Sequence, residues 1–276
     1  MHTLIALLSL VLCFHLKAQE TVPLVLGEQR TIDSKFLNEE RAINIYLPED
    51  YQENDTAHYP VIYILDGGME EDFIHLVGLV RFNTQPWIAR FPGSIVVGIE
   101  NTKRRRDFTF KVASLDFLKE MDIPATQFAE YGGSEHYISF LEHELRNNID
   151  SLYRTSGENT IIGESLGGLL ATEILLEHTE LFTHYIISSP SLWWGNGSLL
   201  DKAALISLKS VRIYIAACQK REEPRMYKDA KKLAEILQKK STSSSRIYFD
   251  YLPEELHSTV LHQAVHHAFT LFYPLN

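Results

Sequence analysis

Continuous apolar runs alternate with segments of helical periodicity along most of the chain. Residues 59–65 and 94–99 are apolar at nearly every position, a pattern that is typical of strands covered on both faces. Between such runs, apolar residues recur at spacings of three and four, as in the segment 137–152, and indicate helices with one buried face. The alternation predicts an α/β fold, with one mostly parallel sheet and helices on both of its faces.

The same patterns place the individual elements. Residues 31–47 alternate polar and apolar positions around a polar turn and predict an antiparallel hairpin at a sheet edge. Residues 107–131 show no clear periodicity and predict an irregular connection. The other predicted strands cover residues 59–65, 94–99, 160–162, 185–188, 211–217 and 246–251, and the predicted helices cover residues 73–82, 132–152, 171–178, 224–240 and 260–272. With no internal repeat and no second core, these elements form one domain over residues 19–276.

The N-terminal segment differs from the rest of the chain. Residues 4–14 form an almost unbroken apolar run of about eleven residues, which is too short to span a bilayer. Its length suits the apolar region of a secretory signal peptide, with Ala18 at the cleavage point. The preceding residues carry no lysine or arginine, and Leu16 stands where a small residue is usual, so a buried N-terminal element is the alternative. We expect residues 1–18 to be a signal peptide and the protein to be exported.

Composition narrows the function classes. The chain has 276 residues, 45% of them hydrophobic and 22% charged, and a net charge of −10, which argues against a nucleic-acid partner. Cleavage after residue 18 would remove Cys13 and leave Cys218 without a disulfide partner. Cys218 is then either a thiol nucleophile or, more commonly, an inert buried residue.

His262 and His266 lack the intervening glutamate of an H-E-x-x-H motif. We therefore expect neither a metal nor a cofactor.

A short β-branched run at residues 160–162 leads directly into the sequence G-E-S-L-G. A strand, a sharp turn and a helix in this order are the signature of a nucleophile elbow. Such a turn holds Ser165 in a strained conformation at the head of a helix, and its flanking positions crowd each other, so that glycine is needed at Gly163 and Gly167. The alternative is an ordinary strand–helix turn that happens to contain a serine.

A serine nucleophile needs a base and an orienting acid. In α/β-hydrolases these follow the serine in the order acid, then histidine. The sequence supplies that order, because a carboxylate pair follows the strand 211–217 and His257 follows the strand 246–251. His257 is predicted to exchange the proton of Ser165, and the acid to orient its ring. Glu222 is favoured over Glu223 as the acid, although both lie in the right loop. Asp229 is a distant third.

Five further residues extend this candidate site. The tetrahedral oxyanion needs two N–H donors, which we expect from Leu166 and from Gly68 in the turn after strand 59–65. Trp193 and Trp194 follow the strand 185–188 and could line a substrate pocket, or pack a cap against the core. An arginine run that ends at Arg106 could bind an anionic ligand, or lie in a solvated loop.

Several segments also match a known family. They are residues 63–68, residues 96–101 with 106–107, the elbow and its helix, and residues 188–194, 222–226 and 256–260. Together they cover roughly residues 30–275, and the chain resembles the putative-esterase family of α/β-hydrolases. That family includes enterochelin and other siderophore esterases, S-formylglutathione hydrolase, feruloyl esterases and mycolyltransferases. The S-P-S-L-W-W stretch and the glutamate-proline loop are most similar to the siderophore-esterase branch.

The resemblance implies an α/β-hydrolase in which Ser165 and His257 are catalytic, with either Glu222 or Glu223 aligned to the glutamate of the family. Cys218 departs from the family, which often has glycine at this position. The leading hypothesis is a serine esterase acting on a small-molecule ester, such as a siderophore lactone. The second hypothesis is a hydrolase of carbohydrate-linked esters, either a feruloyl esterase or an acetyl esterase. The third hypothesis is a non-catalytic binding protein on a hydrolase scaffold.

Overall fold

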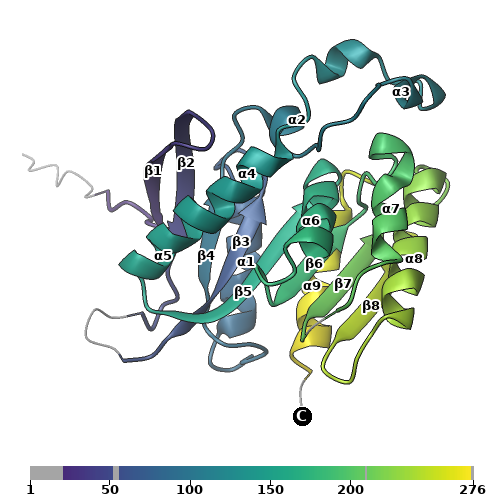
Figure 1. Cartoon of the computed structure of the whole chain (residues 1–276). Coiled ribbons are helices and arrows are strands. Elements are labelled where there is room, and N and C mark those ends of the chain that lie inside the picture. The colour runs from purple at the N-terminus through teal and green to yellow at the C-terminus, as the bar shows by residue number, and fades with distance from the viewer. Residues whose placement is uncertain (1–20, 52–55, 209, 275–276) are drawn as a thin grey trace, which may run out of the picture.

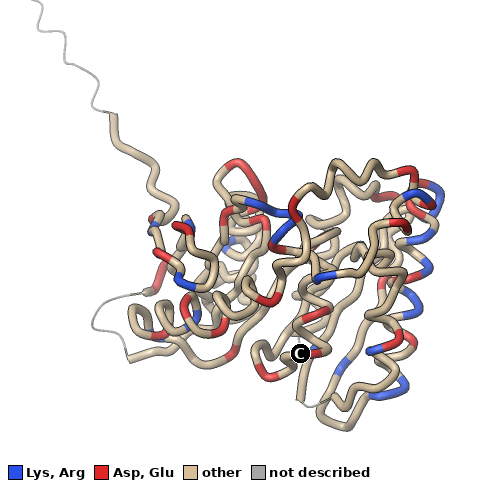
Figure 2. Tube along the Cα trace, turned by 45° about the horizontal axis from the view of Figure 1, so that its top comes forward, with Lys and Arg blue, Asp and Glu red and all other residues tan. Residues whose placement is uncertain are grey.

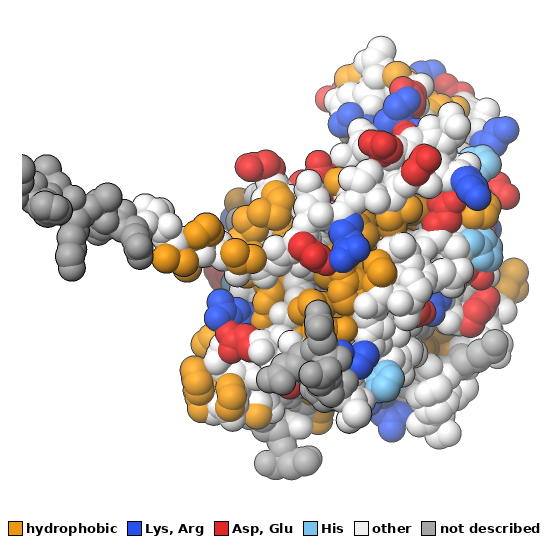
Figure 3. Space-filling model, turned by 90° about the vertical axis from the view of Figure 1, so that its left-hand side faces the viewer, with side chains coloured by type: hydrophobic (Ala, Val, Ile, Leu, Met, Phe, Trp, Pro, Cys, Tyr) orange, Lys and Arg blue, Asp and Glu red, His pale blue; other side chains and the backbone are white. Residues whose placement is uncertain are grey.

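The computed structural model describes residues 21–51, 56–208 and 210–274. The predicted signal peptide lies outside the described residues, so this assignment stays a prediction. The first described residues, 21–25, run away from the body of the molecule (Figures 1 and 3). Across the described ranges, no helix is both long enough and apolar enough to cross a membrane.

A single eight-stranded sheet organises the molecule (Figure 1). Its strands, in spatial order, are β1 (Glu28–Ser34), β2 (Glu39–Tyr46), β4 (Ile95–Ile99), β3 (Tyr59–Leu65), β5 (Thr155–Glu164), β6 (His184–Ser188), β7 (Arg212–Ala217) and β8 (Arg246–Tyr251). The hairpin of β1 and β2 is antiparallel and forms one edge, and β2 also runs antiparallel to β4. All other neighbours are parallel. The fold prediction of a mostly parallel sheet is therefore confirmed.

Two helical layers cover the sheet, as predicted (Figure 1). The helices are α1 (Phe73–Thr84), α2 (Arg104–Asp107), α3 (Phe117–Glu120), α4 (Ser134–Phe140), α5 (Arg146–Leu152), α6 (Leu166–Glu177), α7 (Ser198–Ala203), α8 (Pro224–Lys239) and α9 (Val260–Phe272). Alternate residues of β3 show how the layers are built, because Tyr63 and Leu65 join the core under α4 to α8, whereas Ile62 and Ile64 join the core under α1 and α9. This alternation is the ordinary consequence of a strand buried on both faces.

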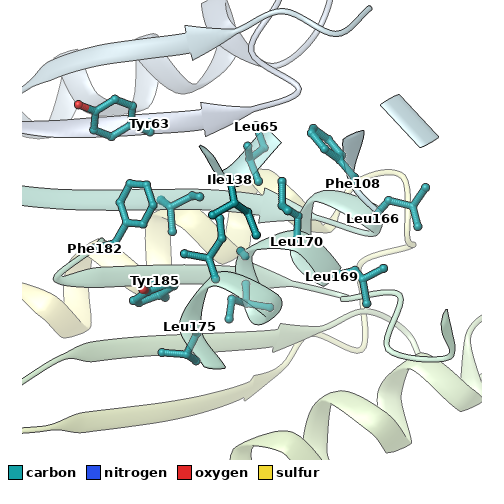
Figure 4. Packing of buried hydrophobic residues seen from close by; sticks show 14 of the residues in the cluster. Tyr63, Leu65, Phe108, Ile138, Leu166, Leu169, Leu170, Leu175, Phe182 and Tyr185 are labelled. Atoms are coloured by element: carbon teal, nitrogen blue, oxygen red, sulfur yellow. The ribbon is translucent and has the colours of Figure 1, made fainter. Parts of the chain in front are cut away.

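Helix α6 is buried almost all round at the centre of its layer. Figure 4 shows its leucines packed among aromatic side chains from neighbouring strands and loops, and Phe182 stands edge-on to both Tyr63 and Tyr185. A helix that is apolar on every face belongs in the core rather than at the surface. The core therefore fixes the position of the helix that follows the predicted nucleophile.

Three features differ from the sequence expectations. The aperiodic connection contains α3 and a short 3₁₀ turn (Ala125–Phe128) and follows directly on α2, and this segment rises above the sheet (Figure 1). The predicted helix 132–152 is interrupted by a π-helical segment (Leu141–Leu145), which hydrophobic periodicity does not register. Helix α7 was not predicted, because its six residues are too few to show a period. A second 3₁₀ turn (Trp194–Gly197) precedes it.

Candidate active site

The turn between β5 and α6 has the geometry of the predicted elbow. Ser165 adopts φ 55° and ψ −116°, a region that non-glycine residues rarely occupy and that stores strain. A Cβ atom on Gly163 would lie 2.4 Å from the carbonyl oxygen of Gly167, so position 163 accepts only glycine. The crowding is one-sided, because a Cβ on Gly167 would meet nothing closer than Asp66 Oδ2 at 3.3 Å.

The Ser165 hydroxyl lies against the loop that follows β6. Ser165 Oγ is 3.2 Å from Ser191 Oγ, and the Ser191 N–H donates to the Ser165 carbonyl at 2.9 Å. The Ser165 N–H donates in turn to the Ser188 carbonyl at 3.1 Å. Ser191 is only 2% exposed. Ser191 was not among the site residues predicted from the sequence. Its place in a Ser-Pro-Ser turn at the end of a parallel strand was the available signal.

His257 and Glu222 come together from the loops after β8 and β7. The backbone N–H of His257 donates to Glu222 Oε2 at 2.7 Å. The side-chain Nδ1 of His257 is buried and, among the described residues, has no hydrogen-bond partner. Glu223 is the N-cap residue that directly precedes α8. Burial raises the pKa of its carboxyl, and the negative charge of the neighbouring Glu222 raises this pKa further. Glu222 is thus the carboxylate that contacts the His257 loop, through the backbone rather than the ring.

Arg104 connects this histidine to the end of β5. Burial lowers the pKa of His257, the charge of Glu222 raises it, and the charge of Arg104 lowers it further. The Arg104 guanidinium pairs with Asp66, with Nη2 2.8 Å from Oδ2, and Nη2 also lies 3.4 Å from the Glu164 carbonyl oxygen. Arg104 therefore acts electrostatically on His257 while contacting the residue just before Ser165.

Glu164 adds a second titratable group directly beside Ser165. Burial raises the pKa of Glu164 to about 8, and the negative charges of Asp72 and Asp66 act in the same direction, whereas Arg104 opposes them. Glu164 is therefore mostly protonated at neutral pH. A neutral side chain here avoids placing a negative charge next to any oxyanion that forms at the elbow.

The two predicted oxyanion donors differ in their surroundings. Leu166 is the first residue of α6, so its N–H has no acceptor within the helix. The Gly68 N–H instead donates to Glu71 Oε2 at 2.7 Å, and Glu71 Oε1 accepts from Asn101 Nδ2 at 2.7 Å. A carboxylate oxygen thus already occupies the Gly68 donor. Glu71 was not among the residues predicted from the sequence.

Of the remaining predicted residues, Trp193, Trp194 and Cys218 are buried, whereas Arg106 lines a surface cavity. Trp194 is 0% exposed, and its indole N–H donates to the Phe110 carbonyl at 2.9 Å, which argues against direct contact with a substrate. Trp193 is buried beside it. The guanidinium of Arg106 pairs with Glu39 and with a second carboxylate, so its charge is already neutralised. Cys218 is fully buried and burial raises the pKa of its thiol, as expected of an inert cysteine.

Comparison with known proteins identifies the family. The family model described as "Putative esterase" matches residues 34–272. The chain belongs to this esterase family. The predicted resemblance and the assignment as an esterase are thereby confirmed.

Several known proteins are similar to the chain over most of their length. The chain is 30% identical over 251 residues to the ferri-bacillibactin esterase BesA of Bacillus subtilis, covering 85% of each chain. It is 27% identical to a siderophore triacetylfusarinine C esterase of Aspergillus fumigatus, covering 69% of this chain and 64% of that one. A solved IroE-like serine hydrolase from Shewanella oneidensis superposes with a TM-score of 0.81 at 29% identity, covering 90% of this chain and 80% of the other. These similarities confirm the α/β-hydrolase fold.

Proposed function

We propose that this esterase hydrolyses the ester bonds of a siderophore lactone, with Ser165 as the nucleophile. The observation that carries the proposal is the strained backbone of Ser165 on a turn that only glycine at position 163 permits. Strain of this kind is retained where it positions a reacting group. The similarity to a ferri-bacillibactin esterase over 85% of both chains supports a siderophore as the substrate class.

In the proposed reaction, Ser165 Oγ attacks the ester carbonyl carbon while His257 accepts the hydroxyl proton. The C–O bond to the leaving alcohol then breaks, and the alcohol takes that proton, which leaves an acyl-enzyme. Water repeats the sequence and releases the acid. Glu222 favours the imidazolium, because its charge raises the pKa of His257. Burial opposes this and keeps the ring neutral between turnovers.

The tetrahedral intermediate places a negative charge next to the start of α6. The N–H of Leu166 and the positive end of the helix dipole are suited to stabilise it. The Gly68 N–H becomes available once Glu71, which is exposed, turns its carboxylate towards solvent. Loss of one such donor typically lowers turnover by about 10²–10³-fold.

A cationic cavity supports an anionic substrate. It has a volume of about 440 Å³ and is lined by Lys103, Arg104 and Arg105, among others. Lys103 and Arg104 are paired with carboxylates. Arg105 is exposed and contacts neutral groups, with its guanidinium 5.4 Å from the Phe128 ring centroid. Arg105 is therefore the member of the arginine run that we assign to anionic oxygens of the siderophore, in place of Arg106.

The test compares kcat/KM for ferri-bacillibactin, a feruloyl sugar ester and p-nitrophenyl acetate. The proposal predicts at least a tenfold preference for the siderophore lactone over the sugar ester, and the reverse order would assign a carbohydrate-linked substrate. Arg105→Ala should raise KM several-fold for the lactone and leave the neutral acetate unchanged. Lys231→Ala, an exposed cation on α8, is the matched control and should change neither. Equal effects on both esters would refute the role of Arg105.

A further inference from the structure

A second cavity, of about 600 Å³, lies beside the half of α6 that is remote from Ser165. It opens between α4, the π-helical segment, α6 and α7, which cover the same face of the sheet in Figure 1. None of the residues assigned above to catalysis or to substrate binding lines it. The cavity is thus a separate feature that ester hydrolysis does not explain.

Glu173 is the most unusual residue of this cavity. It is only 5% exposed, and its Oε1 accepts a hydrogen bond from Ser134 Oγ at 2.9 Å. Its Oε2 is buried and has no hydrogen-bond partner within the described ranges. An ionised carboxylate in this position has no ion pair among the described residues, and a protonated one still leaves Oε2 without a hydrogen-bond partner. Either state costs about 1–3 kcal/mol or more when nothing else is bound.

The rest of the lining is acidic. Four glutamates line the cavity against two lysines. Lys202 pairs with Glu177, and Glu142 lies 3.8 Å and 3.9 Å from the rings of His143 and His178. These pairs leave Glu173 without an ion pair among the described residues, and Lys202, which is shared with Glu177, only partly offsets its negative charge. Figure 2 shows acidic and basic residues interspersed along the trace, and the excess of carboxylates in this cavity has the same sign as the net charge of −10 of the whole chain.

Two further observations suit a cationic ligand. Phe110 lines the cavity, and the ammonium of Lys202 already lies 5.9 Å from its ring centroid, so the ring is placed to face a cation. Glu142 and His143 belong to the π-helical segment, and single π turns within α-helices are frequent at functional sites.

The chemistry of the donors decides the kind of cation. In the part of the chain that the structure describes, no group of three His, Cys, Asp or Glu residues could hold a metal ion. An ammonium group needs fewer preorganised ligands, because one carboxylate and one or two further oxygens satisfy its three N–H donors. We propose that this cavity binds an organic cation with a primary ammonium group, towards which the Glu173 side chain turns its buried Oε2 to accept a hydrogen bond.

The proposal predicts a pH dependence of binding. Burial raises the pKa of Glu173 to about 7, against the opposing hydrogen bond from Ser134. The charges that face it are Glu135 on α4, Glu177 on α6 and Lys202 on α7. An ammonium pairs with the ionised carboxylate, so binding at pH 6 should displace a proton and be weaker than binding at pH 8.

Isothermal titration calorimetry of the full chain with putrescine tests the site directly. Putrescine should bind with one-to-one stoichiometry, and 1,4-butanediol, its neutral analogue, should not. Glu173→Gln keeps the shape and should weaken binding at least tenfold, whereas Glu235→Gln, an exposed glutamate on α8, should bind as the wild type does. Circular dichroism establishes that both variants are folded.

Three outcomes would overturn the proposal: no binding of putrescine, equal binding by Glu173→Gln, or tighter binding at pH 6 than at pH 8. Binding of Mn²⁺ that depends on Glu173, with no binding of putrescine, would replace the amine by a metal. Because the readout is binding heat, the result is independent of whether the chain hydrolyses siderophores.

Discussion

Replacing Gly163 by alanine tests the elbow geometry without removing any functional group. The new Cβ would lie 2.4 Å from the Gly167 carbonyl oxygen and 2.5 Å from its carbon, whereas real Cβ atoms essentially never come closer than 3.0 Å. The turn must therefore open by at least ~0.6 Å. Overpacking of this kind typically destabilises by about 1–3 kcal/mol, and a displacement near 1 Å in a catalytic group lowers turnover by about 10²-fold.

Gly78→Ala is the matched control. Gly78 lies within α1, and a Cβ there would meet nothing within 4 Å. That substitution should be neutral or stabilise by about 0.4–1 kcal/mol. Urea denaturation gives the free energy of unfolding, and p-nitrophenyl acetate hydrolysis gives kcat. The reasoning is refuted if Gly163→Ala matches the wild type in both measurements, or if Gly78→Ala is as damaging.

Three further predictions concern the groups around the site. His257 must be neutral to accept a proton, so kcat/KM should fall as the pH drops through the pKa of His257, which lies below its ordinary value of 6.5 because burial lowers it. Glu222→Gln should move this acidic side of the pH–rate profile to still lower pH, and an unchanged profile would contradict the electrostatic pairing of Glu222 with His257. Asp107→Asn leaves the buried Arg41 without its buried partner and should lower the free energy of unfolding by about 3 kcal/mol. This value is at the lower end of the usual range because a second carboxylate also contacts Arg41. A loss below about 1 kcal/mol in urea denaturation would contradict this prediction. Glu71→Ala frees the backbone N–H that its carboxylate occupies and should raise the rate of fluorophosphonate labelling several-fold, whereas a tenfold fall would show that Glu71 supports the site.

The parts of the fold that depend on local pattern could be predicted from the sequence. Strand β8 and helix α9 begin and end where the periodicity places them. The elbow was predicted because its requirements are local: a strand, a serine at a positive φ, and a glycine two residues before it. The parallel topology then brings the ends of β3, β5, β7 and β8 to one edge of the sheet.

The features that sequence reasoning missed depend on contacts between distant residues. The partner of Arg106 is Glu39, 67 positions earlier in the chain, and no spacing rule connects them. The burial of Trp194 depends on how the segment between β4 and α4 folds over it, and that segment lacks periodicity. Glu71 escaped notice because an exposed glutamate in a polar turn has many ordinary explanations. A hydrogen-bond partner for a backbone N–H becomes visible only in three dimensions.

The central claim is that Ser165 is an activated nucleophile. Treatment with a fluorophosphonate, followed by mass spectrometry of the digested protein, measures this directly. The account predicts one added phosphonyl group, located on Ser165, with labelling abolished in Ser165→Ala and slowed at least a hundredfold in His257→Ala. Absence of labelling, or a label on another residue, would contradict the account and favour a binding protein that keeps the hydrolase scaffold.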